Sequence, residues 1–259
     1  MKTTQYQNLF SYVIVPLLIL SCSDSNDLVM QHQKSGGINT NTYLIYSPDT
    51  KEAALFDVAG EIDTLVNVIE KLNLDLKYIF LTHGHFDHLV GVPEIKAKYK
   101  NAKIVIHELD YKDIFTQREW VIANLGKEFV EYLESDPERK KIIDFDVDSF
   151  GEPEIIITTN RNLKFGSTEI RAIHSPGHSP GSICYYIDGM LFSGDVLFKG
   201  TIGRADVQNS SREDQIKSVQ KLYELFPENI KVFPGHGPFT NIGTEEKENK
   251  KISLDNVNF

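Results

Sequence analysis

Four side chains able to bind a metal ion fall within six residues of the chain, in the stretch 82–88 (THGHFDH). An apolar run, residues 78–81, precedes this stretch, and an amphipathic segment, residues 89–99, follows it. This order predicts a turn between a strand and a helix, where catalytic groups are often found. Three imidazoles and one carboxylate on such a turn indicate a metal site.

Three further turns carry side chains of the same kind, and each follows a β-rich run: residues 174–181 (HSPGHSPG), 192–195 (FSGD) and 233–238 (FPGHGP). Gly and Pro allow the backbone to turn sharply, so that a side chain can project from the end of a strand. Six of the eight histidines lie in these four segments, which we call the ligand turns. His32 and His107 lie outside them, and we interpret both as ordinary structural residues.

The number of ligands exceeds what one metal ion needs. Neutral imidazoles and carboxylates suit Zn(II), Fe(II) or Mn(II). His83 and His85 can reach one ion across a tight turn, which leaves Asp87 and His88 for a second. A tetrahedral catalytic site needs only three protein ligands and a water. Two divalent ions about 3.5–4 Å apart, most simply two Zn(II), would account for the surplus, with Asp195 as the bridging carboxylate.

Strand and helix patterns alternate along the chain. Strands are expected at residues 28–31, 40–46, 52–57, 77–82, 103–107, 154–158, 163–165, 169–174, 182–187, 190–193 and 230–233, and helices at 61–72, 92–99 and 212–225. The alternation occurs once before and once after residues 108–150, which predicts two sheets packed face to face with helices outside. Cys184 lies in an apolar run and is expected to be a small buried core residue. The charged residues 244–251 are expected to form a short exposed helix or tail.

Residues 108–150 differ in character and are interpreted as a helical insertion. Residues 119–133 have a helix-like apolar face, whose members are Trp120, Val121, Leu125, Phe129, Val130 and Leu133. Residues 135–141 are strongly polar. Two interpretations remain open: a lid or wall of a substrate pocket, or a surface helix that packs on the core without a functional role.

The ligand turns together resemble the metallo-β-lactamase superfamily, whose HxHxDH motif is followed by a histidine in PGHSPGS, an aspartate in SGD and a histidine in PGHGP. Within it the chain is similar to the glyoxalase II-like (hydroxyacylglutathione hydrolase-like) subgroup, on residues 192–206 and 235–243. The similarity extends from about residue 28 to residue 246. It implies an α/β (α+β) fold, the four-layered αβ/βα sandwich of that superfamily.

The resemblance also implies a role for each ligand residue. One ion would be held by His83, His85 and His178, and the other by Asp87, His88 and His236. Asp195 would bridge them, and Asp87 would also orient the attacking hydroxide, which makes Asp87 and Asp195 the expected catalytic residues.

Three further residues receive roles from the resemblance. His174 would orient a metal ligand through a hydrogen bond. Lys199 and Arg204 match a basic segment that lies near the substrate in thioester-hydrolysing relatives. The alternative for this segment is a structural ion pair with Asp206 or with the turn.

The sequence departs from the glyoxalase II pattern in two places. It has no counterpart of the C-terminal helical domain that binds glutathione in full-length glyoxalase II. Residues 248–251 (ENKK) stand where many short relatives have Asn-Pro. Both departures weaken the case for a glutathione thioester as the substrate but leave the metal chemistry unaffected.

The expected function is that of a metal-dependent hydrolase that uses a metal-bridging hydroxide to cleave a small-molecule thioester or related small ester. The main alternative is a persulfide dioxygenase, with one Fe(II) held by His83, His178 and Asp195. A β-lactamase or lactonase is a further alternative, although β-lactamases of this superfamily generally lack the bridging aspartate. A ribonuclease and a non-catalytic metal-binding relic are the remaining alternatives.

The first 22 residues resemble a signal segment, with Lys2 and a 12-residue apolar stretch that is too short to span a bilayer. Cys22 is the expected lipid attachment site of a bacterial lipoprotein, residues 23–27 would form a polar tether, and residues 28–259 a single domain. The alternative is an ordinary cleaved signal peptide, and either way the protein is expected to be exported to the cell envelope or periplasm. Membrane contact is expected only through Cys22.

The formal charge of −10, from 27 basic and 37 acidic residues, argues against a nucleic-acid partner, because phosphates demand a basic surface. The oligomeric state is not predicted.

Overall fold

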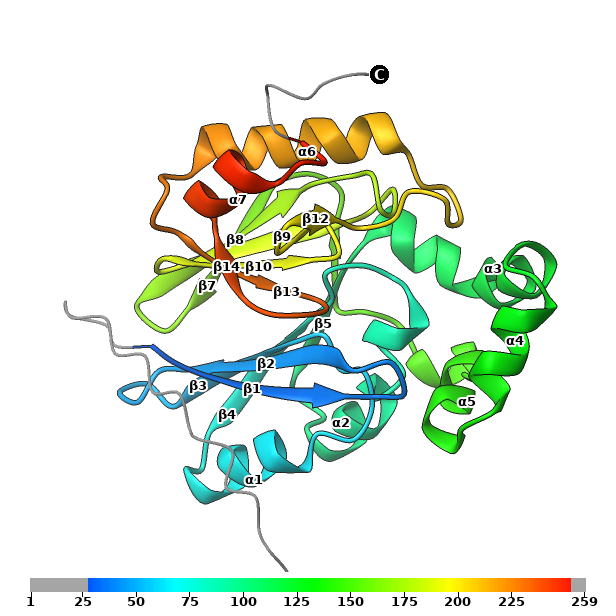
Figure 1. Ribbon diagram of the computed structural model, residues 1–259. Coiled ribbons are helices and arrows are strands. Elements are labelled where there is room, and N and C mark those ends of the chain that lie inside the picture. The colour runs from blue at the N-terminus through cyan, green and yellow to red at the C-terminus, as the bar shows by residue number, and fades with distance from the viewer. Residues whose placement is uncertain (1–27, 253–259) are drawn as a thin grey trace, which may run out of the picture.

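Two six-stranded sheets lie face to face at the centre of the fold (Figure 1). This computed structural model describes residues 28–252. The first sheet contains, in spatial order, β1 (Val29–Ser35), β2 (Thr40–Tyr46), β3 (Glu52–Phe56), β4 (Asp75–Phe80), β5 (Lys103–His107) and β6 (Ile155–Ile157). The second contains β14 (Thr240–Asn241), β13 (Lys231–Pro234), β10 (Met190–Gly194), β9 (Ile183–Ile187), β8 (Thr168–His174) and β7 (Arg161–Phe165).

Helices cover the outer face of each sheet and complete four layers. Helices α1 (Asp63–Lys71) and α2 (Val92–Lys98) lie against the first sheet, and α6 (Arg212–Leu225) and α7 (Ile242–Glu248) lie against the second (Figure 1). The fold is therefore the four-layered α/β sandwich that the resemblance implied. No helix in residues 28–252 is both long enough and apolar enough to cross a membrane.

Both faces of each sheet are buried, so the strands have apolar side chains on both sides. In β2, Leu44 belongs to the core under α1 and α2, while Tyr43 and Ile45 belong to the core between the sheets, as the alternation of side chains along a strand requires. Between the sheets the rings of Phe56 and Phe192 stack with centroids 4.0 Å apart. Cys184 lies in the third core, under α6 and α7, as a buried free thiol, which confirms its predicted place.

One strand lies in a different sheet from the one that the alternation predicted. β6 follows the helical insertion in sequence, yet it pairs in parallel with β5 and forms the edge of the first sheet. The second sheet begins only at β7. Three two-residue strands were not predicted: β11 (Leu197–Phe198), β12 (Thr201–Ile202) and β14.

Residues 108–143 form three helices beside the sheets: α3 (Glu108–Asn124), α4 (Lys127–Glu134) and α5 (Pro137–Ile143) (Figure 1). The predicted continuous face over residues 119–133 is broken, because Gly126 has a φ of 82° and a left-handed residue ends a helix. The polar residues after it form α5, whose first turn is capped by Asp136: its carboxylate accepts hydrogen bonds from the Glu138 and Arg139 amides.

Two single-turn 3-10 helices, η1 (Phe86–His88) and η2 (Val147–Phe150), complete the described elements. Residues 244–251 were expected to be a short exposed helix or tail, and α7 confirms a helix as far as Glu248. The segment is only partly exposed, because Glu245 and Asn249 are buried. The expected signal segment, tether and Cys22 lie outside the described residues.

Candidate metal centre

The four ligand turns meet at one end of the two sheets. The first follows β4, the second follows β8, the third continues from β10 and the fourth from β13, so each begins at the carboxyl end of a strand. The structure brings all seven predicted ligands together in three overlapping groups whose ligand atoms lie within 4.8 Å of one another. These groups are His83/His85/His178, His83/His88/Asp195 and Asp87/His88/His236.

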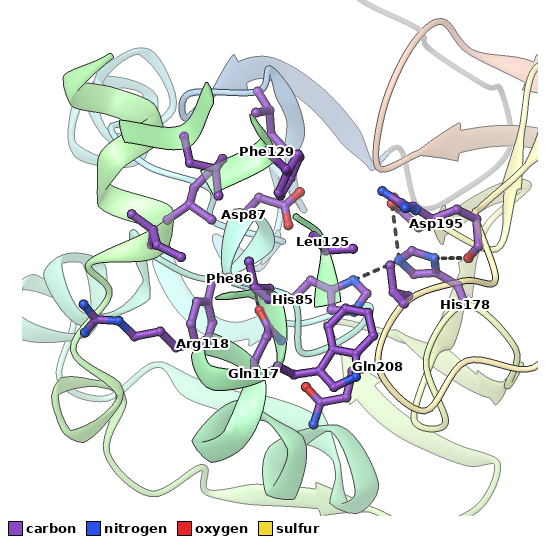
Figure 2. Close-up of a pocket in the computed structure, with 18 of the residues that line it drawn as sticks. His85, Phe86, Asp87, Gln117, Arg118, Leu125, Phe129, His178, Asp195 and Gln208 are labelled. Atoms are coloured by element: carbon purple, nitrogen blue, oxygen red, sulfur yellow. Dashed lines mark hydrogen bonds and ion pairs between the residues drawn. The ribbon is translucent and has the colours of Figure 1, made fainter. Parts of the chain in front are cut away.

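Asp195 lies between the two outer groups. Its Oδ2 is 3.5 Å from Nε2 of His178 (Figure 2). Its Oδ1 is 3.5 Å from Nε2 of His88. On one side, Nε2 of His178 is 2.9 Å from Nδ1 of His85. On the other, Nε2 of His236 is 3.2 Å from both Nε2 of His88 and Oδ2 of Asp87. A carboxylate in this position can face two ions at once.

Two buried polar atoms in the cluster have no hydrogen-bond partner: Nε2 of His83 and Oδ1 of Asp195. Buried polar atoms are nearly always paired, so such orphans point to a missing ligand. Imidazole nitrogens and carboxylate oxygens that converge on the same small space are the donor set of Zn(II) and of non-haem iron. The residues therefore fit divalent metal ions.

Hydrogen bonds behind the ligands aim their free nitrogens into the cluster. Oδ2 of Asp57 accepts a hydrogen bond from Nδ1 of His88, at 2.8 Å, and another from the Thr82 hydroxyl. The carbonyl oxygen of Arg204 accepts one from Nδ1 of His178, at 2.8 Å. Such contacts fix the ring orientation and leave Nε2 free to bind a metal. The prediction missed Asp57, although its place as a carboxylate at the end of an apolar strand was a usable signal.

A second missed residue, Asp110 on α3, joins two ligand turns. Its buried carboxylate accepts hydrogen bonds from the Gly84 amide (2.8 Å), the Ser179 hydroxyl (2.6 Å) and the Gly181 amide (2.6 Å). A Cβ on Gly181 would lie 2.5 Å from Oδ1 of Asp110, so only glycine permits this approach. Asp110 sits inside a helix and outside any ligand-rich motif, so no local pattern indicated it.

Two buried glutamines hold the ligand turns in a similar way. Oε1 of Gln117 accepts a hydrogen bond from the Phe86 amide, and its Nε2 donates to the Gly84 carbonyl. Oε1 of Gln215 accepts one from the His178 amide at 2.6 Å, and its Nε2 donates to the Val196 carbonyl. Each side-chain amide thus replaces a backbone partner that a turn cannot supply.

Burial sets the charge of the first group. Burial and the neighbouring His178 lower the pKa of His85 to about 3, and burial lowers the pKa of His178 to about 4. Burial, with nearby histidines, also holds the pKa of His83 well below its usual value. These three imidazoles are therefore neutral at neutral pH, which is the form that binds metal.

Carboxylates dominate the second group. Burial alone would lower the pKa of His88, but Asp87, Asp57 and Asp195 together raise it well above the ordinary value. The pKa of Asp87 is held well below its usual range because His88 and His236 outweigh the effect of burial. Without a bound metal ion, the negative charge of these carboxylates is therefore balanced by a protonated His88. A bound cation would take over that role.

The structure does not give His174 its predicted hydrogen bond to a ligand. Its Nε2 lies 2.9 Å from the carbonyl oxygen of Pro180, and its ring stacks on His107 with centroids 4.2 Å apart. It therefore braces the backbone of the second ligand turn. The reason is its position at the last residue of β8, before the chain turns back toward the cluster.

The two predicted substrate residues have different surroundings. Arg204 lines the cavity described below and forms a two-point ion pair with Asp206, at 2.6 and 3.0 Å, as the structural alternative expected. Lys199 is exposed and is not among the residues that line the cavity.

A cavity of about 470 Å³ opens on the cluster. Asp87, His178, Asp195 and His236 lie on its metal side, and side chains from α3, α4 and α5 form the opposite wall (Figure 2). Of the two interpretations of the helical insertion, this geometry favours the pocket wall. A small molecule in the cavity would contact both the ligand cluster and the helices.

Comparisons with known proteins agree with this geometry. The chain is 32% identical over 212 residues to the hydroxyacylglutathione hydrolase GloC of Haemophilus influenzae, covering 81% of this chain and 91% of that one. It is 30% identical over 216 residues to the probable metallo-hydrolase YqgX of Bacillus subtilis, covering 83% and 92%. Among solved structures, the BLEG-1 B3 metallo-beta-lactamase superposes with a TM-score of 0.69 at 31% identity, covering 87% of this chain and all of that one.

The family model described as the metallo-beta-lactamase superfamily matches residues 35–236, a range that contains all four turns except the last two residues of the fourth. With the two-sheet fold and the clustered ligands, this match shows that the chain belongs to the metallo-beta-lactamase superfamily.

Proposed function

We propose that this protein is a metal-dependent hydrolase that cleaves a thioester or a related small ester, in the manner of glyoxalase II. The observation that carries the proposal is the position of Asp195, whose carboxylate lies within 3.7 Å of histidines from both outer ligand groups, at the side of the cavity. The similarity to GloC supports the choice of a thioester.

Two divalent ions, zinc in the simplest case, would be held by the two outer groups: His83, His85 and His178 for one, and Asp87, His88 and His236 for the other. Asp195 would bridge them. When bound, such ions supply an activated water and polarise the carbonyl that it attacks.

The side chains themselves orient the reacting groups. Asp87 lines the cavity, and its depressed pKa keeps it ionised, so it can accept a hydrogen bond from the attacking water and orient it. Asp57 and the Arg204 carbonyl hold the rings of His88 and His178 in place. A substrate that fills the cavity against the apolar side chains of the helices opposite would displace water, which would strengthen electrostatic interactions at the reacting carbonyl.

A persulfide dioxygenase is the second candidate, because one specific observation favours it. His83, His88 and Asp195 form a group of two histidines and one carboxylate, the donor set typical of mono-iron oxygenases. This set contains His88 in place of the His178 expected from the sequence.

Metal analysis of the purified protein beside three assays separates the candidates. Two zinc-type ions with thioester hydrolysis would support the proposal, whereas one iron with oxygen uptake on a glutathione persulfide would support the second candidate. Hydrolysis of nitrocefin without thioester hydrolysis would replace both with a β-lactamase.

A matched pair of variants tests the role of Asp195. Asp195→Asn is expected to lower the metal content and the activity together, by at least about tenfold in activity. Asp188→Asn, on the exposed turn at the other end of the same strand pair, serves as the control and should change neither. Full activity of Asp195→Asn with two ions bound would refute the bridging role.

A further inference from the structure

We infer that the substrate carries an apolar chain or ring in its acyl group, and that this group binds against α3, α4 and α5. This inference rests on the proposed hydrolase function and names the class of ester or thioester that the site selects.

The wall opposite the metal cluster includes apolar side chains that lie outside the three core clusters. Trp120, Val121, Leu125 and Phe129 line the cavity and are only half-buried. None of them belongs to the three core clusters of the described residues. A contiguous apolar surface left open in this way commonly marks a binding site. A ligand that covers this apolar surface would gain the free energy of burying it.

The apolar wall is held at a fixed position relative to the ligand cluster. Gln117, one turn before Trp120 and Val121 on α3, hydrogen-bonds both the Phe86 amide and the Gly84 carbonyl of the first ligand turn. Asp110, two turns earlier, binds the second ligand turn as well. A group that fills the wall is therefore positioned with respect to the atoms that would do the chemistry.

The charged groups of the cavity suit an apolar substrate better than a peptide thiol such as glutathione, which carries two carboxylates and one ammonium group. The cavity is lined by two guanidinium groups, and that of Arg204 is already paired with Asp206. Arg118 is exposed. Both ends of the Gln117 amide are occupied by backbone groups. Two substrate carboxylates would thus find only one unpaired cation among the described lining residues.

The test compares thioesters of one small thiol, N-acetylcysteamine, with acetyl and octanoyl groups, using the full chain loaded with zinc. Burial of each methylene is worth about fourfold in affinity, so kcat/KM is expected to be at least about tenfold higher for the octanoyl thioester. Phe129→Ala and Val121→Ala should reduce this preference severalfold. Phe115→Ala and Ile122→Ala are matched controls on α3, because both side chains are exposed (47% and 53%), and neither lines the cavity; the preference should persist in both.

Binding can be measured independently of hydrolysis, because Trp120 is the single tryptophan of the chain. The unreactive thioether S-octyl-N-acetylcysteamine is expected to change the fluorescence of Trp120. The S-methyl analogue is expected to leave it unchanged. Equal hydrolysis of acetyl and octanoyl thioesters, or a preference unaffected by the wall variants, would overturn the inference and leave the hydrolase function intact. Binding of the octyl thioether with no hydrolysis of any ester would overturn the proposed function and still support an apolar ligand.

Discussion

Replacement of Asp110 by asparagine tests whether the ligand turns are held from behind by α3. The Asp110 carboxylate is buried and accepts three hydrogen bonds, two from the second ligand turn and one from the first. An asparagine side chain at this position would have the same shape but only one acceptor oxygen, and its NH2 group would face an N–H or O–H donor. At least one buried donor would then lose its partner.

The expected loss in the free energy of unfolding follows from these contacts. Hydrogen bonds to a charged group contribute about 1.5–3 kcal/mol each, and a buried donor left unpaired costs about 1–3 kcal/mol. The loss is offset in part because the variant no longer buries a charge. The cost of burying that charge is reflected in the pKa of Asp110, which burial raises to about 6 although the three hydrogen bonds act to lower it. We therefore expect a net loss of about 2 kcal/mol at pH 8.

The loss should depend on pH with a defined sign. The pKa of Asp110 is higher in the folded protein, about 6, than the ordinary value of 3.8. Its contribution to stability is therefore greatest below pH 3.8 and falls as the pH rises through 6. The asparagine variant lacks this titration, so the wild type should exceed it by about 1.5 kcal/mol more at pH 5 than at pH 8.

Urea unfolding of the metal-free protein, followed by circular dichroism and by the fluorescence of Trp120, measures both the loss in the free energy of unfolding and its dependence on pH. Asp113→Asn is the control, because Asp113 lies one turn further along α3 and its side chain accepts only one described hydrogen bond, from Asn209. Competition with a chromophoric chelator should show weaker zinc binding for the Asp110 variant alone. Equal stability of the two variants, or unchanged zinc affinity of Asp110→Asn, would refute the reasoning.

Three further outcomes follow from the site. Asp57→Asn should weaken metal binding about 10–100-fold, because only one acceptor oxygen would remain for the His88 ring, the Thr82 amide and the Thr82 hydroxyl; unchanged affinity in a chelator competition would contradict this. Removal of zinc should lower the free energy of unfolding by about 2.7 kcal/mol for each bound ion when the free zinc had been a hundredfold above the Kd of that site, as urea titrations with and without chelator would show. Lys199→Ala should change kcat/KM for a thioester by less than about twofold, since the side chain is exposed and outside the cavity; a larger drop would restore its predicted role in substrate binding.

The sequence was most informative where the candidate functional residues lie in short motifs. All seven ligand residues lie in turns rich in Gly, Pro and His, and the structure brings all seven together. The residues that hold those turns escaped prediction, because Asp110, Gln117 and Gln215 lie in helices among other polar residues and belong to no ligand motif. Their role depends on which turn the helix packs against, and that is a property of the tertiary structure.

The fold shows the same limit. Apolar alternation located most strands, but the membership of β6 in the first sheet depends on its pairing with β5 across the whole helical insertion. The break between α3 and α4 was visible as Gly126 but was outweighed by the apolar periodicity on either side. A backbone φ of 82° decides the outcome there, and periodicity does not report backbone angles.

The ligand turns are bound to the opposite sheet as well as to their own strands. The hydroxyl of Tyr43, on the first sheet, donates a hydrogen bond to the Pro234 carbonyl in the turn that carries His236. In return, the hydroxyl of Tyr185, on the second sheet, donates to the Leu81 carbonyl just before His83. Each half of the ligand set is therefore positioned by the half of the fold that does not contain it. Because the geometry of the metal centre depends on the packing of the two sheets, a core substitution between them can alter metal binding without touching a ligand.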